Sequence, residues 1–164
     1  MKKILVTLLL LVSCSSLISA QENTAIYKEA LRIIENSPTY KELGIESYTT
    51  SETSISFGNQ AYAFWLDDST LNFPDRDFEN YFGELYAPIE IPAFKELCQK
   101  RRSKFVFFVT ETENNVFVIE ILVFNRKRRG KYPKFYQGKS YSFLFRKDAE
   151  NSVKLMHNLE IVNN

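Results

Sequence analysis

Two long apolar runs separated by a short polar segment dominate the hydrophobic pattern of the chain. Residues 105–110 and 116–124 are rich in β-branched and aromatic side chains and contain no Gly or Pro. The polar residues 111–115 between them have the length and composition of a hairpin connection. The second run is apolar on both alternating faces, as expected for a central strand covered on both sides. Residues 140–146 and 153–162 extend the pairing, so the pattern predicts an antiparallel sheet of four consecutive strands.

Helical spacing of apolar positions is typical of the part of the chain that precedes this sheet. A helix is expected from Thr24, as its cap, to about residue 36, and a short helix over residues 37–44. Two further helices are expected, one opening at residues 72–74 and one opening at Pro92. The fold class is therefore α+β, with N-terminal helices packed on a curved, mostly antiparallel sheet.

A hairpin is expected between these two groups of helices. Residues 45–57 and 61–66 are predicted to be strands, joined by a turn at Gly58–Asn59. The resulting order is helix, short helix, hairpin, helices and four antiparallel strands. This order of elements resembles the NTF2-like or cystatin-like arrangement, in which a curved sheet wraps the first helix into a cone. Because such folds host enzymes, carriers and interaction domains alike, the resemblance implies a shape and no particular activity.

Residues 1–20 have the organisation of a bacterial export signal. Two lysines follow the initiator Met, residues 4–12 form an apolar core too short to span a bilayer, and Ala20 precedes a polar stretch. Cleavage after Ala20 would leave residues 21–164 as a single exported domain, periplasmic or secreted.

A second cleavage position is also open. Residues 11–14, Leu-Val-Ser-Cys, resemble the lipobox of bacterial lipoproteins, which would anchor the protein through a lipid on Cys14. The apolar residues 17–18, which continue the hydrophobic core, favour cleavage after Ala20 instead. Either processing removes or acylates Cys14, which leaves Cys98 without a second thiol, so no intramolecular disulfide is expected. Because Cys98 follows a helical pattern, we expect it to be buried.

Charge is distributed unevenly along a chain whose formal net charge is +1. Residues 21–97 carry 5 Lys and Arg against 14 Asp and Glu, a charge of −9, whereas residues 98–164 carry 14 against 6, a charge of +8. Residues 126–139 hold seven basic residues, three aromatics and no acid. The candidate anion-binding residues in this stretch are Arg126, Lys127, Arg128, Arg129, Lys131 and Lys134.

Cations interleaved with aromatics suit phosphate, nucleic acid or acidic glycans. An exported protein rarely meets nucleic acid, so we expect none as a partner, and an anionic partner or surface is the interpretation that this loop favours. The alternative is a loop that is merely solvated.

Glu120 and His157 interrupt apolar faces of two predicted strands. A buried polar side chain costs stability unless it is satisfied, so the two residues could line a pocket as a general acid and base. The strand over residues 140–146 would separate them by two strand spacings, about 10 Å, which is beyond hydrogen-bond reach. We therefore expect both to be structural. No cofactor is expected, and no Cys or His cluster indicates a metal site.

Two hypotheses about function follow from the sequence. The first is a non-catalytic exported binding or interaction module whose best candidate contact is the basic loop. The second is a small-molecule enzyme or carrier that uses a sheet-lined pocket containing Glu120 and His157. A cavity that opens onto both residues would favour the second.

Overall fold

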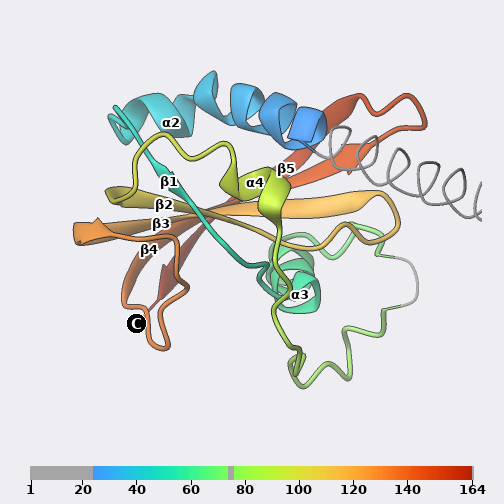
Figure 1. The fold of residues 1–164 in the computed structure, drawn as a ribbon. Coiled ribbons are helices and arrows are strands. Elements are labelled where there is room, and N and C mark those ends of the chain that lie inside the picture. Colours follow the sequence, from blue (N-terminus) through green and yellow to red (C-terminus); the bar gives the residue numbers. More distant parts are fainter. Residues whose placement is uncertain (1–23, 74–75, 164) are drawn as a thin grey trace, which may run out of the picture.

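The computed structural model describes residues 24–73 and 76–163 of the chain (Figure 1). The predicted export signal, with its alternative lipid site at Cys14, lies outside these ranges. Within them, no helix is both long and apolar enough to cross a membrane.

A five-stranded sheet forms the middle of the molecule, with strands in the order β1-β2-β3-β4-β5. β1 runs parallel to β2, and every other neighbouring pair is antiparallel. The sheet is open and mostly antiparallel, which confirms the predicted α+β class and the meander of four consecutive C-terminal strands. The strands are β1 (Thr49–Thr50), β2 (Ser103–Val109), β3 (Val116–Arg128), β4 (Gly138–Lys147) and β5 (Val153–Asn163).

β3 lies at the centre of the sheet, and both of its faces are covered over the first seven residues. Phe117, Ile119 and Ile121 point to one face and belong to the larger apolar core. Val118 and Leu122 point to the opposite face, where two smaller apolar clusters lie. Burial on both sides explains why this strand has an almost continuous apolar sequence.

Helices cover both faces, so the domain has three layers (Figure 1). The first helix, residues 24–35, lies across one face, followed by α2 (Pro38–Glu42). α4 (Pro92–Lys95) packs into the same core through Phe94. α3 (Phe57–Asp67) covers the opposite face.

The predicted hairpin of residues 45–57 and 61–66 is wrong, because its second strand is the helix α3. Ser56 caps this helix by accepting a hydrogen bond from the backbone N–H of Asn59 at 3.2 Å, which places Gly58–Asn59 in the first turn. Phe57, Ala61 and Phe64 then follow at helical spacing and are buried. The stretch 61–66 is apolar enough to satisfy a strand or a helix, and packing against β3 and β4 selects the helix.

The segments flanking α3 are also less regular than predicted. Residues 45–57 contribute only β1 and two isolated bridges, at Thr53 and Ile55. The helix expected after residue 74 does not form in residues 76–90. Side-chain hydrogen bonds and ion pairs hold that segment instead, and Gly83 adopts a left-handed conformation with φ of +86°.

The helix opened by Pro92 is confirmed but is short. α4 ends at Lys95, so Cys98 lies in the turn beyond it and is exposed, contrary to the prediction that it would be buried. Its sulfur lies 3.0 Å from the carbonyl oxygen of Lys100.

A β-bulge in β5 changes the predicted alternation along that strand. Leu155 pairs with Phe145 and His157 pairs with Leu144, so one extra residue is accommodated between them. Leu155 therefore packs on the face covered by the first helix, whereas Leu159 packs on the face covered by α3. Simple alternation along β5 would have placed Leu155, His157 and Leu159 on one apolar face, and the bulge prevents this.

Candidate functional site

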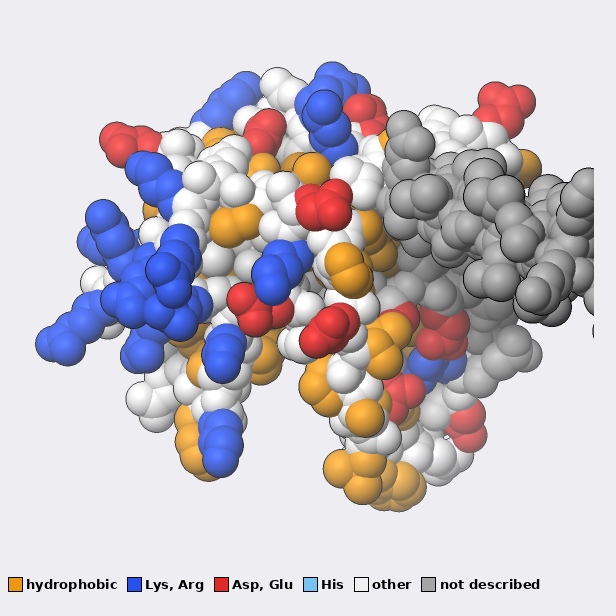
Figure 2. Space-filling view, in the orientation of Figure 1, with side chains coloured by type: hydrophobic (Ala, Val, Ile, Leu, Met, Phe, Trp, Pro, Cys, Tyr) orange, Lys and Arg blue, Asp and Glu red, His pale blue; other side chains and the backbone are white. Residues whose placement is uncertain are grey.

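The basic residues of 126–139 lie at one end of the sheet, where β3 extends beyond its last pairing with β4, at Leu122 and Ser140, and leads into the connection to β4. We call this segment the basic hairpin. A group of Lys and Arg side chains lies over this end of the sheet, at the left of Figure 2. A concave surface of about 1150 Å³ runs along it, and Arg102 from the segment before β2 adds a further cation to the lining.

Most of these cations lack a carboxylate partner. Lys139 pairs with Glu160 at 2.5 Å. The guanidinium of Arg128 lies 5.9 Å from the ring centre of Phe124, and no ion pair reaches the other hairpin cations from the described residues. The structure thus groups all six predicted anion-binding residues on one exposed surface, at positions Arg126, Lys127, Arg128, Arg129, Lys131 and Lys134.

Two contacts fix the hairpin to the rest of the domain. The Tyr136 hydroxyl lies 2.8 Å from the carbonyl oxygen of Val123 and accepts a hydrogen bond from the Val123 N–H at 3.0 Å. The carbonyl of Gly130 accepts a hydrogen bond from the Glu52 N–H at 3.2 Å. Gly130 approaches β1 so closely that a Cβ there would overlap the carbonyl oxygen of Thr50. The hairpin is therefore a docked structure rather than a free loop.

The three aromatics of the hairpin do not act as one set. Tyr136 packs its ring against Phe124, with ring centres 5.3 Å apart, and Tyr132 packs edge-on against Phe108 at 4.9 Å. Phe135 alone of the three is almost fully exposed, at 94%. Two of the three rings are therefore packed against the sheet, and Phe135 is the ring of the hairpin that stands in solvent.

Glu120 lies in the centre of β3 with only 3% of its surface exposed. Its carboxylate accepts hydrogen bonds at 3.3 Å from the side-chain amide of Gln60 on α3 and from the hydroxyl of Tyr132 on the basic hairpin. Gln60 in turn accepts a hydrogen bond at 3.0 Å from Ser142 on β4. Glu120 lies in a regular part of β3, paired with Phe108 of β2 and Ser142 of β4.

Burial dominates the electrostatics of this carboxyl group. It raises the pKa of Glu120 to about 7, against the smaller opposing effect of hydrogen bonds from Ser140 and Tyr132. The pKa of the Tyr132 hydroxyl is raised as well, first by burial and then by the charge of Glu120. Tyr132 therefore stays a neutral donor to a carboxylate that gains or loses its charge near neutral pH.

His157 lies elsewhere on the same side of the sheet. Its Nε2 atom is 2.8 Å from a carboxylate oxygen of Asp67, the last residue of α3, and its ring meets Phe64 edge-on at 5.8 Å. The side chain is 31% exposed. Glu120 and His157 share no partner, and no group of three or more metal-ligating side chains occurs in residues 24–73 and 76–163. The structure therefore does not assemble the acid–base pair that the sequence allowed.

A cleft of about 570 Å³ opens between the basic hairpin and the segment that leads to α4. In Figure 2 the lower edge of the molecule is notched between these two projections. Residues 52–56 and the first turns of α3 form the floor, Tyr86 stands on one side, and Lys131 and Tyr132 stand on the other. We call this the tyrosine cleft.

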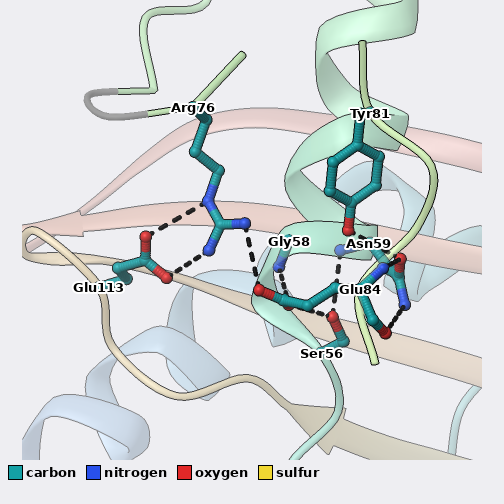
Figure 3. Close-up of polar contacts among 7 residues, drawn as sticks. All are labelled: Ser56, Gly58, Asn59, Arg76, Tyr81, Glu84 and Glu113. Carbon is teal, nitrogen blue, oxygen red and sulfur yellow. Dashed lines mark hydrogen bonds and ion pairs between the residues drawn. The ribbon is translucent and has the colours of Figure 1, made fainter. Parts of the chain in front are cut away.

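A network of ion pairs holds the wall that carries Tyr86 (Figure 3). Arg76 donates two hydrogen bonds to the carboxylate of Glu113, at 3.3 and 2.6 Å, and a third to Glu84 at 3.2 Å. Glu84 also accepts from the hydroxyl of Ser56 at 2.5 Å and from the backbone N–H of Gly58 at 3.0 Å, at the start of α3. The network thus ties the segment after residue 76 to α3 and to the β2–β3 turn.

Burial alone would raise the pKa of Glu84, but the bonds from Ser56, Gly58 and Arg76 outweigh it and hold the pKa below its ordinary value. Asn59 adds to the network by accepting hydrogen bonds from the Tyr81 hydroxyl at 2.9 Å and from the Glu84 N–H at 3.0 Å. No spacing rule pairs Arg76 with acids this far along the chain, so reasoning from the sequence missed the network.

We expect Arg76→Met to lower the free energy of unfolding by about 1–3 kcal/mol, because it leaves two partly buried carboxylates without their shared cation. Hydrogen exchange should also speed up in residues 79–90. Arg32→Met is the matched control: Arg32 pairs with Glu29 at the surface, with 65% of its side chain exposed, and its loss should change stability little. Equal losses in the two variants, measured by chemical denaturation, would contradict a stabilising role for the network.

Comparison with known proteins gives no relative from which the role of this site could be inferred. No protein-family model, no curated protein and no solved structure matches the chain.

Proposed function

We propose that this protein is a non-catalytic exported binding module, with the basic hairpin as its contact surface for an anionic partner or surface. The observation that carries the proposal is the grouping of six exposed cations, without ion-pair partners in the described residues, on a hairpin docked by Tyr136 and Gly130. Like charges held together repel one another, so their clustering on a fixed scaffold favours an external anion as the missing counter-charge.

The arrangement of charge supports the same proposal. The acidic half of the sequence supplies α3 and the wall of the tyrosine cleft, whereas the basic half supplies the hairpin. A domain with opposite charges on separate surfaces can orient itself against a polyanion. The enzyme hypothesis, which needs Glu120 and His157 in one pocket, receives no such support, because the two side chains have separate partners.

We expect retention on heparin, and on vesicles containing an anionic lipid, to fall steeply as salt rises, because screening shortens to about 8 Å at physiological ionic strength. Reversing Arg128→Glu and Arg129→Glu together should lower the salt concentration at which the protein elutes from heparin. Stability should change little, since exposed charges contribute only about 0–1 kcal/mol each.

The control is a reversal of the same size at another place. Lys28 on the first helix and Lys154 on β5 are exposed and have no ion pair within the described ranges, so Lys28→Glu with Lys154→Glu changes net charge equally. Elution of this control close to wild type, with early elution of the hairpin variant, supports the proposal. If the two variants elute together, the hairpin is merely solvated.

The proposal also includes export of the protein and a cone-like arrangement of the fold. Export, to the periplasm or outside the cell, rests on residues 1–20, with lipidation at Cys14 as the alternative that intact-mass measurement would reveal. The NTF2-like or cystatin-like cone is supported by the packing of helix 24–35 across one face of the meander. The covering of the other face by α3 does not support it.

A further inference from the structure

Glu120 is a buried carboxylate that the proposed role of the basic hairpin does not use. Its hydrogen-bond donors, Gln60, Tyr132 and Ser140, are neutral, and no cationic side chain of the described residues contacts it. A buried carboxylate without a positive partner is costly to the fold. A cation from outside the chain would relieve that cost.

A cation in the tyrosine cleft would lie close to Glu120. Gln60 and Tyr132 both line the cleft, and both donate to the same oxygen of Glu120 at 3.3 Å. The carboxylate therefore lies one hydrogen bond behind the cleft wall. Because Glu120 is buried, its charge would act on a cation in the cleft more strongly than it would in bulk water.

Two aromatic rings face the cleft from opposite sides. Tyr86 is 37% exposed and is held by a 2.9 Å hydrogen bond from its hydroxyl to the carbonyl oxygen of Ser54. Tyr132 is 46% exposed and is held by Glu120 and by the ring of Phe108. Both hydroxyls are thus occupied by the protein, which leaves ring surface for a ligand. The electron-rich faces of Tyr rings attract cations.

Acidic groups outnumber basic ones around this cleft. Glu52 lines it and is half exposed, with only a long contact of 3.6 Å to Lys95. Glu111 lies behind Ser54, whose hydroxyl donates to it at 2.6 Å. Lys131 is the one basic side chain in the lining. The carboxylates of Glu52, Glu111 and Glu120 therefore lie in or directly behind the lining, against the one cation that Lys131 contributes to it from the described residues.

The serine hydroxyls on the floor of the cleft are already hydrogen-bonded within the protein, so they offer little to a neutral polar ligand. The Ser54 hydroxyl donates a hydrogen bond to Glu111 and accepts one from the Ile89 N–H. The Ser56 hydroxyl donates to Glu84 and accepts from the Asn59 N–H. A sugar would need free donors and acceptors at this floor. A compact organic cation needs mainly rings and a carboxylate.

We propose that the tyrosine cleft binds a small organic cation, a protonated amine or a quaternary ammonium, between Tyr86 and Tyr132 and in front of Glu120. This site goes beyond the anion-binding role of the hairpin, since it takes a ligand of opposite charge and depends on Tyr86, Tyr132 and Glu120 rather than on the hairpin cations. Lys131 and Tyr132 line both surfaces.

Choline and its uncharged isostere 3,3-dimethylbutan-1-ol are the probes. Titration at pH 8, followed by NMR on the 21–164 chain or the full chain, should shift the backbone resonances of residues 86 and 130–132 with choline. Choline should bind at least about tenfold more tightly than the isostere, because the two share a shape and differ in charge. Equal affinity, or no saturable shift with choline at tens of millimolar, would overturn the proposal.

Three variants separate the parts of the site. Glu120→Gln keeps the shape and removes the charge, so choline affinity should fall at least about fivefold while that of the isostere stays constant. Tyr86→Leu, which leaves Glu120 untouched, should weaken choline binding to a similar extent. Glu150→Gln, an exposed change in the β4–β5 turn, should have no effect. Choline affinity unchanged in both cleft variants would overturn the assignment.

The two proposals can fail independently. Heparin retention of Glu120→Gln should equal that of wild type, and choline affinity should persist in the Arg128→Glu, Arg129→Glu variant, as neither arginine lines the cleft.

Discussion

Replacing Glu120 with Gln is expected to raise the free energy of unfolding at pH 8 by on the order of 3 kcal/mol and to leave it nearly unchanged at pH 4. The folded-state pKa of about 7 lies above the ordinary 4.5, because burial disfavours the charged form. Between these two values the folded protein holds a proton that the unfolded chain releases. Wild-type stability therefore falls as pH rises from about 4.5 to about 7, and the Gln variant lacks this loss.

Urea denaturation of both proteins at pH 4, 6 and 8 measures the effect, and the difference between them isolates Glu120 from other groups. This difference is needed because Glu84 also makes stability depend on pH. Its pKa is lowered in the folded protein, so its contribution to the free energy of unfolding rises with pH, in a more acidic range. Glu150→Gln serves as the exposed control. A constant difference between wild type and Glu120→Gln across this pH range would show that the carboxyl group titrates normally.

Gly130→Ala is expected to lower the free energy of unfolding by about 3 kcal/mol. A Cβ at this position would overlap the carbonyl oxygen of Thr50 and press on the backbone of Ser51. Backbone atoms cannot rotate out of the way as a side chain can, so the hairpin would have to move away from β1. That movement would break the hydrogen bond from the Glu52 N–H to the Gly130 carbonyl.

Gly44→Ala is the control that separates steric overlap of an added Cβ from the cost of a left-handed backbone conformation. Gly44 has φ of +60°, but an added Cβ there would meet no atom within 4 Å, so the expected cost is only about 1 kcal/mol. Thermal or urea denaturation of the two variants gives the comparison. A loss in Gly130→Ala no larger than that in Gly44→Ala would mean that the hairpin is not docked on β1 in solution.

The C-terminal meander could be predicted from sequence because its signal is local. Continuous β-branched and aromatic runs, interrupted by short polar turns, define β2 and β3, and neighbouring strands in sequence pair in space. The same holds for helix 24–35 and for α2, where an apolar stripe, a Ser cap and Pro38 agree. The basic hairpin was also visible, since its cations are adjacent along the chain.

Elements whose signal is ambiguous were decided by packing. The apolar stretch 61–66 suits either a strand or a helix, and the Ser56 cap, with burial of Phe64 against the sheet, makes it α3. The bulge between Leu155 and His157 moves each to a different face, and a single extra residue leaves no mark on the hydrophobic pattern.

The candidate sites depend most on tertiary structure. Sequence alone showed Glu120 as a polar interruption of an apolar strand, and His157 as another. The pairing of Glu120 with Tyr132 and of His157 with Asp67 joins residues from different elements. Arg76 likewise reaches Glu113 across the fold. Such contacts form only when distant segments are packed together, so the charge pattern of this chain follows from its sequence, whereas its cleft follows from its fold.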